Sequence, residues 1–250
     1  MSEATATKTA KVALITGANR GIGLETARQL GAKGITVLMG ARDLKRGEAA
    51  AAELKKQGID ARALKLDVVD ACDVRAAAET IEREFGRLDI LVNNAGISRE
   101  ALNPNSTLTV TDEAMRKTFD TNFFAVVNLT NALLPLLRKS EAGRIVNVSS
   151  ILASLTFHTT PGSPIYDAKV FAYGASKAAL NMYTIHLAYS LKDTKIKVNS
   201  ADPGWVKTDL GTDAAPLEVV DGAKTEVELA TLPEDGPTGG YFHMGETVPW

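Results

Sequence analysis

Short apolar segments alternate along the chain with segments that carry helix start and stop signals, and this alternation limits the possible folds. The apolar runs are rich in β-branched residues, as buried strands are. Predicted strands are residues 12–16, 36–39, 63–66, 90–92, 145–148 and 196–198. Strands that alternate with helices pair in parallel through right-handed crossovers. The sequence therefore predicts an α/β fold, a Rossmann-like doubly wound parallel sheet with helices on both faces.

The helix signals lie between these strands. Residues 43–57 begin at an aspartate and close at Gly58, and residues 70–85 likewise close at Gly86. Longer helices are predicted from about 112 to 137 and from about 173 to 191. Residues 154–167 and the tail after Gly211 are predicted as loops, because they are rich in turn residues.

Length and composition fit one globular domain. The 250 residues are 45% hydrophobic and 23% charged, which is enough apolar material for a single core between helical layers. We predict one oxidoreductase domain over residues 1–250, with residues 1–10 flexible and residues 152–172 forming an insertion near the active site.

Charge and targeting signals exclude several classes of partner. The 28 basic and 30 acidic residues nearly cancel, so no strong field favours nucleic acid or anionic lipid. The first eleven residues are polar, and no run is apolar and long enough to span a membrane, so we expect a cytoplasmic protein. Cys72 is the only cysteine and the three histidines lack zinc-ligand spacing, so no metal site is predicted.

A glycine-rich turn directly follows the first predicted strand and opens the first helix. Its glycines allow a sharp turn and a close approach to a pyrophosphate, which the N–H groups of the helix N-terminus attract. The segment therefore predicts a dinucleotide site, although a glycine turn made only for packing is the alternative. The residues assigned to the cofactor here are Gly17, Asn19, Arg20, Gly21, Ile22 and Gly23.

The end of the second strand indicates which dinucleotide binds. An enzyme that uses NAD places a carboxylate there against the ribose 2′-hydroxyl, whereas this chain has Ala41 followed by Arg42. Arg42 and Arg20 together suit a 2′-phosphate, which favours NADPH. The alternative is that both arginines are solvated. Asp43 might contact the ribose, but its place before a helix suits an N-cap better.

Further cofactor contacts are expected where the other strands end. Asp67 and Val68 follow the third strand, where Asp67 either reaches the adenine or caps a helix. Contacts to the ribose and nicotinamide are assigned to Asn94, Ala95, Gly96, Pro203, Gly204, Val206 and Thr208.

Tyr173 and Lys177 stand four residues apart on a predicted helix, so both side chains project from one face. A phenol becomes a reversible proton donor when a neighbouring ammonium stabilises the phenolate. Ser150, at the end of the fifth strand, is placed to bind the same carbonyl oxygen, and Lys177 to hold the nicotinamide ribose. Asn122 is assigned to anchor a water beside Lys177. Each residue alone has a structural explanation, but their combination favours catalysis.

The order of these motifs resembles the short-chain dehydrogenase/reductase family over nearly the whole chain. Arg20 with Arg42, the segment 203–209 and the ending 236–250 resemble the carbonyl reductases most. The resemblance implies NADPH-dependent reduction of an aldehyde or ketone. The alternatives are a catalytically silent NADPH-binding regulator and an NAD-dependent epimerase-type enzyme.

The separation of Ser150 from Tyr173 departs from the usual pattern. At 23 positions, it is longer than in most bacterial members and shorter than in the animal carbonyl reductases. The animal enzymes, with a longer insertion here, are monomers, because the insertion covers helices that otherwise pair between subunits. We therefore predict a monomer, with a homo-oligomer as the alternative. The stretch between Thr208 and Ala223 is short and leaves little sequence for a substrate lid.

Overall fold

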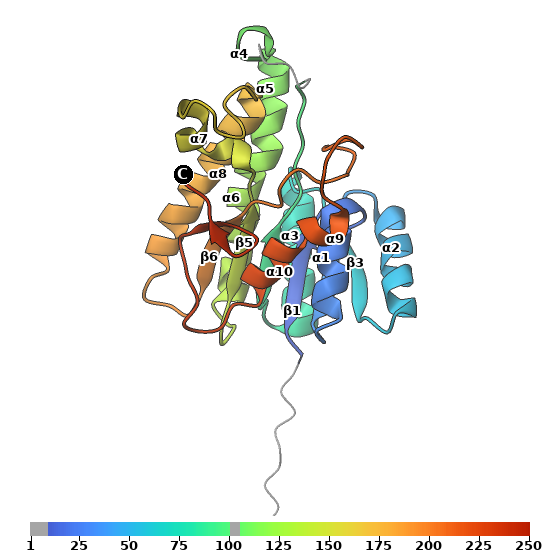
Figure 1. Ribbon diagram of the computed structural model, residues 1–250. Helices are drawn as coiled ribbons and strands as arrows, with labels where there is room; N and C mark the ends of the chain where they lie inside the picture. The colour runs from blue at the N-terminus through green and yellow to red at the C-terminus, as the bar shows by residue number, and fades with distance from the viewer. Residues whose placement is uncertain (1–9, 101–105) are drawn as a thin grey trace, which may run out of the picture.

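The computed structural model describes residues 10–100 and 106–250, whose strands form one sheet between two layers of helices (Figure 1). The strand order is β3-β2-β1-β4-β5-β6-β7-β8, and all neighbours are parallel except β7 and β8. This order confirms the predicted doubly wound sheet. The bounds are β1 Val12–Thr16, β2 Thr36–Ala41, β3 Ala61–Lys65, β4 Ile90–Asn93, β5 Arg144–Val148, β6 Lys197–Ala201, β7 Tyr241–His243 and β8 Glu246–Thr247.

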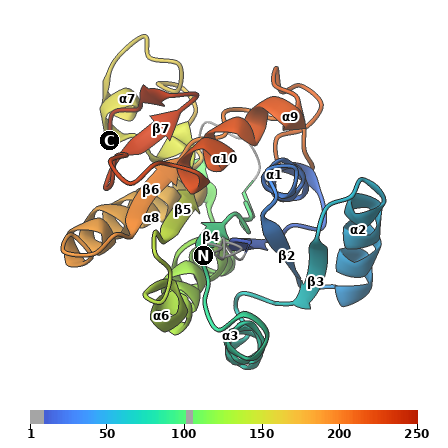
Figure 2. The same cartoon turned by 90° about the horizontal axis from the view of Figure 1, so that it is seen from below.

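Figure 2 shows the helices α1, α2 and α10 on one face of the sheet and α3, α6 and α8 on the other. The helix bounds are α1 Gly21–Gly31, α2 Leu44–Lys56, α3 Ala71–Phe85, α4 Ser106–Thr109, α5 Asp112–Phe119, α6 Ala125–Leu137, α7 Leu155–Thr159, α8 Phe171–Ser190, α9 Val219–Gly222 and α10 Lys224–Ala230. A π-helix, η1, covers Asp120–Phe124 and joins α5 to α6, and a 3-10 helix, η2, covers Ile151–Ala153.

The apolar strands separate two core layers because successive side chains point to opposite faces. In β1, Ala13 and Ile15 pack in the layer under α1, α2 and α10, whereas Val12 and Leu14 pack in the layer under α3, α6 and α8. All five residues of β1 are buried, as expected for a central strand of a parallel sheet.

Helix caps match the sequence signals closely. The Asp43 side chain accepts a hydrogen bond from the Arg46 backbone N–H at 3.2 Å, which confirms it as an N-cap. Asp70 caps α3 in the same way, and Gly86 ends that helix in the left-handed conformation with φ of 69°.

Two loop predictions were wrong in part. Residues 154–167 contain α7, and the tail after Gly211 contains α9, α10, β7 and β8. Both segments are rich in turn residues, so the sequence did not predict these short helices and strands. α10 forms because its apolar side chains close the core over β4, β5 and β6. Residues 1–9 of the segment predicted as flexible lie outside the described residues.

The predicted strands are all present; β1 has the predicted ends, the others are shifted by one to three residues, and the largest shift is at the end of β6. In the described part of the chain, none of the helices is long and apolar enough to cross a membrane.

One ionisable group lies in the core between α1 and α10. The side chain of Glu226 is fully buried, and its Oε2 accepts a hydrogen bond from Thr26 Oγ1 at 2.8 Å. Its Oε1 has no hydrogen-bond partner in the described structure. Burial raises the pKa of Glu226 to about 8, against the opposing effects of Thr26 and the positive charge of Lys177. A carboxyl group is therefore kept neutral in the core at neutral pH.

This burial predicts how stability depends on pH. In the unfolded chain Glu226 ionises above its ordinary pKa of 4.5, whereas in the folded protein it stays protonated up to about 8. Folding stability therefore falls as the pH rises between these values, by up to ~1.4 kcal/mol per pH unit from this group. Glu226→Gln should remove this loss, so the variant should gain in Tm over the wild type at pH 8 but not near pH 4.5.

Thermal unfolding at several pH values measures this difference. The control is Glu228→Gln, which changes an exposed carboxylate on the same helix. An advantage of Glu226→Gln that is equal at every pH would contradict the burial argument.

Candidate active site

The glycine turn lies between the end of β1 and the start of α1. Gly17 and Gly21 have φ of 66° and 55°, in the left-handed region that favours glycine. α1 begins at Gly21, and its N-cap residue Arg20 makes no side-chain capping bond. The first N–H groups of α1 therefore lack a side-chain cap, an arrangement suited to a phosphate. Asn19 and Ile22 are half-buried within the same turn.

Thr16 and Asn94 join the ends of β1 and β4. Thr16 Oγ1 accepts hydrogen bonds from the backbone N–H groups of Asn94 and Ala95, at 3.0 and 2.9 Å. The Asn94 side chain donates to the Thr16 carbonyl oxygen at 2.7 Å. A Cβ on Gly23 would lie 2.4 Å from Asn94 Nδ2, so the third glycine of the turn leaves room for this amide.

Among the described residues, no hydrogen bond or ring contact joins Arg20 to Arg42. Ala41 is fully buried at the end of β2 and Arg42 is exposed directly after it, as the sequence predicted. Arg20 instead forms an exposed ion pair with Asp209. Exposed pairs of this kind contribute little stability, so the Arg20 guanidinium is free to exchange partners.

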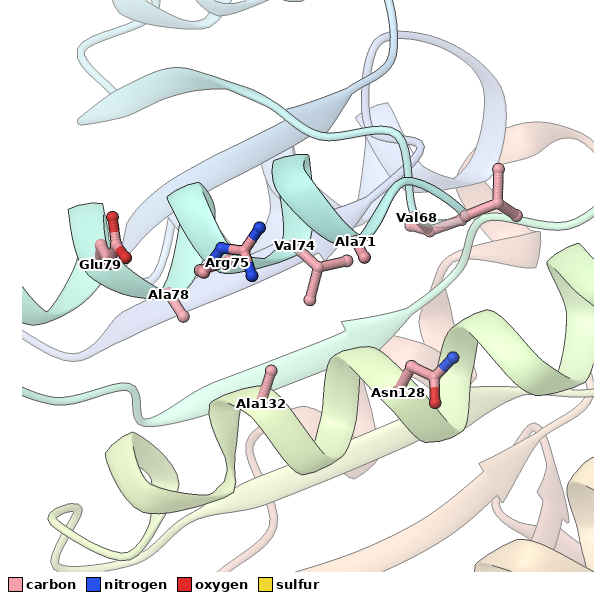
Figure 3. A pocket seen from close by; sticks show the side chains of 9 residues that line it. Val68, Ala71, Val74, Arg75, Ala78, Glu79, Asn128 and Ala132 are labelled. Carbon is pink, nitrogen blue, oxygen red and sulfur yellow. The ribbon is translucent and has the colours of Figure 1, made fainter.

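Asp67 does not cap α3, since Asp70 performs that role. The Asp67 carboxylate accepts a local hydrogen bond from the Val69 N–H at 3.3 Å, and Asp67 is half-buried just after β3. Val68 borders a groove of about 420 Å³ between α3 and α6 (Figure 3). The four residues predicted to be catalytic do not line this groove.

Tyr173 and Lys177 lie together on α8, near Ser150 at the end of β5. Burial raises the pKa of the Tyr173 phenol to about 12, and the neighbouring Ser150 hydroxyl has a smaller, opposing effect. Lys177 Nζ lies 5.8 Å from the centroid of the Tyr173 ring. It donates a hydrogen bond to the Val148 carbonyl oxygen at 2.7 Å. Burial lowers the pKa of Lys177 to about 8.

With these pKa shifts, Tyr173 holds a proton that it can donate before a reaction begins. At neutral pH the Tyr173 phenol carries its proton, and Lys177 remains largely charged. We predicted that Lys177 lowers the phenol pKa, whereas burial has the largest effect and raises the pKa of Tyr173.

Asn122 lies on the π-helix η1 and is fully buried. Its Oδ1 accepts a hydrogen bond from the Ile97 N–H, and its Nδ2 donates to the Ile97 carbonyl oxygen, both at 2.9 Å. Nδ2 also donates to Ser176 Oγ at 3.1 Å. π-turns are frequent at functional sites. Asn122 therefore ties the loop after β4 to the helix that carries Tyr173.

The last part of the site comes from the segment after β6. Pro203 and Val206 are buried, and a Cβ added to Gly21 would lie 3.5 Å from Thr208 Cγ2. Thr208 thus lies over the glycine turn. A Cβ on Gly96 would lie 3.4 Å from Lys177 Nζ, so the loop after β4 also reaches the catalytic helix.

Two side chains around this site, Glu100 and Asp202, were not predicted from the sequence. Glu100 Oε2 accepts a hydrogen bond from the Tyr173 N–H at 2.9 Å and so caps α8, whose own N-cap residue, Val170, makes no side-chain bond. Asp202, which directly precedes Pro203, is buried beside His243. Only the tertiary structure reveals these contacts, since the partners are far apart in sequence.

Comparisons with known proteins agree with this geometry. The family described as short chain dehydrogenase matches residues 11–217. "Short-chain dehydrogenase/reductase 1" of Saponaria officinalis is 37% identical, with 96% of each chain covered. Human "carbonyl reductase (NADPH) 3" is 34% identical, with 96% of this chain and 98% of the relative covered.

A solved structure is similar over almost the same length. The NADPH-bound carbonyl reductase from chicken fatty liver superposes with a TM-score of 0.84 at 28% identity, covering 96% of this chain and 99% of that one. Because the family model matches residues 11–217 and a relative is 37% identical over 96% of the chain, this chain belongs to the short-chain dehydrogenase/reductase family.

Proposed function

We propose that this protein is an NADPH-dependent carbonyl reductase that reduces an aldehyde or ketone to an alcohol, a reaction that also runs in reverse. The observation that carries the proposal is the Tyr173 phenol, whose pKa Ser150 lowers and whose ring centroid lies 5.8 Å from the Lys177 ammonium. The names of the carbonyl reductase relatives support the same reaction.

The cofactor fits the residues present. The left-handed glycine turn and the uncapped N-terminus of α1 suit a pyrophosphate, and Arg42 suits a 2′-phosphate. The proposed cofactor contacts are Gly17, Asn19, Arg20, Gly21, Ile22, Gly23, Arg42, Asp67, Val68, Asn94, Ala95, Gly96, Tyr173, Lys177, Pro203, Gly204, Val206 and Thr208. NADPH, when bound, supplies the hydride that reduces the carbonyl carbon.

The chain's own residues manage the proton. Ser150 and Tyr173 donate hydrogen bonds to the carbonyl oxygen as negative charge develops on it. Tyr173 then transfers its proton to that oxygen, and the Lys177 ammonium stabilises the phenolate that remains. Asn122 is proposed to hold a water that returns a proton through Lys177.

Consumption of NADPH with a panel of aldehydes and ketones tests the function. Turnover of at least one carbonyl is expected. NADPH binding without turnover of any panel member would instead favour the regulator.

We propose a cytoplasmic location, with which the single cysteine, exposed and unpaired, agrees.

Replacement of the phenol tests the assigned proton donor. Tyr173→Phe should lower kcat by about 10²- to 10⁴-fold, because general acid catalysis contributes about that much, with the Kd for NADPH nearly unchanged. The control is Tyr189→Phe, which alters an exposed tyrosine on the same helix. Near-normal turnover by purified Tyr173→Phe would refute the assignment.

A second test asks whether Arg42 recognises the 2′-phosphate that distinguishes NADPH from NADH. A charge-assisted hydrogen bond contributes roughly 1.5–3 kcal/mol, so Arg42→Ala should weaken NADPH binding by about 10- to 100-fold and leave NADH binding nearly unchanged. Fluorescence titration with each cofactor measures this, with the exposed Arg138→Ala as the control. Equal losses for both cofactors would show that Arg42 does not read the phosphate.

The insertion before α8 bears on the oligomeric state. It meets the first turns of α8, since a Cβ on Gly174 would lie 2.8 Å from the Leu152 carbonyl oxygen. Farther along, Met182 and Tyr189 remain exposed on α8. The insertion can therefore block subunit pairing only at the start of that helix.

We retain the monomer as a proposal with a direct test. Light scattering at micromolar concentration should give a monomer for the wild type, and shortening residues 154–167 should allow association. A wild-type dimer or tetramer that pairs through α6 and α8 would overturn the blocking argument.

A further inference from the structure

Two short helices follow Ser150 and are joined to each other by a histidine. Ser150 begins η2, and its Oγ accepts a hydrogen bond from the Leu152 N–H at 3.3 Å. Ser154, which is fully buried, caps α7 by accepting from the Phe157 N–H at 3.1 Å. The ring of His158, on α7, reaches back to η2, where its Nε2 lies 3.1 Å from the Leu152 carbonyl oxygen. One side chain of the insertion thus contacts the turn that binds the Ser150 hydroxyl.

The two partners of the His158 ring determine which nitrogen carries the hydrogen. A carbonyl oxygen only accepts, so Nε2 donates to Leu152. On the other side of the ring, Lys169 Nζ lies 3.3 Å from Nδ1, and because an ammonium group only donates, Nδ1 accepts. Lys169 also donates to the His158 carbonyl oxygen at 3.0 Å. These contacts fit the neutral imidazole with its hydrogen on Nε2.

The electrostatics of the ring agree with this neutral form. Burial has the largest effect and lowers the pKa of His158. The bond to the Leu152 carbonyl oxygen opposes this effect, and the positive charge of Lys169 lowers the pKa further. At neutral pH the imidazole therefore stays uncharged, and Nδ1 keeps the lone pair that accepts from Lys169.

The Leu152 carbonyl oxygen also lies against the helix that carries Tyr173. A Cβ on Gly174 would lie 2.8 Å from this oxygen and 3.8 Å from His158 Nε2. A side chain so close to a backbone oxygen would force it to move, so the glycine leaves room for the hydrogen bond. α7 accordingly lies beside the first turn of α8 (Figure 1). The bond from His158 to Leu152 is therefore made next to both Ser150 and Tyr173.

We propose that His158 is a positioning residue that fixes Leu152 and, through the Leu152 N–H, the hydroxyl of Ser150. A hydroxyl has a single hydrogen, and Ser150 Oγ accepts from Leu152, so that hydrogen is left to bind the carbonyl oxygen of the substrate. The proposal rests on the proposed function, since Ser150 is taken to bind that oxygen. His158 acts through Leu152 and touches neither the substrate nor the hydride.

The tautomer of His158 is measured without any turnover. In nitrogen-15 NMR spectra of the protein with NADPH at neutral pH, His158 should be neutral with its hydrogen on Nε2, its signals being assigned by their loss in His158→Gln. Lys169→Met should shift the Nδ1 signal, whereas Lys192→Met, which changes an exposed lysine in the turn after α8, should not. A hydrogen on Nδ1 alone would overturn the proposal, because Nε2 then has nothing to donate to Leu152.

Hydrogen exchange of the same complex tests whether His158 fixes Leu152. His158→Leu keeps an apolar side chain but loses the donor, so the Leu152 amide should exchange about 3- to 10-fold faster, as expected for the loss of one hydrogen bond. His158→Gln should restore most of the protection, because its amide nitrogen donates from nearly the position of Nε2. The matched control is His186→Leu, which changes an exposed histidine on α8. Unchanged exchange of the Leu152 amide in His158→Leu would refute the positioning role.

Turnover of a carbonyl then connects His158 to Ser150. His158→Leu should lower kcat by about 3- to 10-fold with the Kd for NADPH unchanged, and His158→Gln should recover most of the rate. In a Ser150→Ala background, His158→Leu should cost less than about 2-fold, because residues that act as a unit are not additive.

Two outcomes of the kinetics contradict different claims. A full additional loss in the Ser150→Ala background, or no rescue by His158→Gln, would show that His158 does not act through Ser150. If the wild type turns over no carbonyl, the proposed function fails, while the tautomer and the exchange of the Leu152 amide still decide whether His158 fixes Leu152.

Discussion

The parallel pairing of β1 with β4, closed by Thr16 and Asn94, is the interaction on which the site depends. The strand order reverses between these two strands, so their carboxyl ends border the crevice where this fold binds ligands. The Thr16 hydroxyl accepts two backbone hydrogen bonds, and the Asn94 amide donates to the Thr16 carbonyl oxygen. The amide occupies the space that a side chain at Gly23 would need. The glycine turn therefore has two roles. It allows the cofactor to approach closely, and it leaves room for the Asn94 amide that binds Thr16.

Asn122 connects the loop after β4 to α8, the helix that carries Tyr173. It holds Ile97, three residues beyond Asn94, by both backbone groups, and it holds Ser176 on α8. Glu100 from the same loop caps α8 at the Tyr173 N–H. A helix on one face of the sheet is thus fixed to the strand ends at two points. Buried networks of this kind are costly when one member loses its partner, so they favour one geometry of the catalytic residues over others.

The sequence predicted the sheet and its central strands because each has a local signal, and the proposed catalytic residues also follow from local signals. β1 is a continuous apolar run followed by glycines, and Tyr173 and Lys177 share a helical face by spacing alone. The sequence missed β7, α10 and the cap by Glu100. Those features depend on contacts between distant segments, such as the 73 positions between Glu100 and Tyr173. Arg20 shows the same limit, since its pairing with Asp209 has no local signal.

Burial decides which protonation state the site has before a reaction begins. Tyr173 is half-buried and Lys177 is buried, and the desolvation of these groups disfavours both the phenolate and the ammonium. The phenol with a pKa of about 12 keeps its proton at neutral pH, whereas Lys177, with a pKa of about 8 and a hydrogen bond to Val148, stays mostly charged. A protonated phenol beside a cation is the state that donates a proton to a carbonyl oxygen. The same site oxidises an alcohol only after the phenol has lost its proton, so neutral pH favours reduction and alkaline pH favours the reverse reaction.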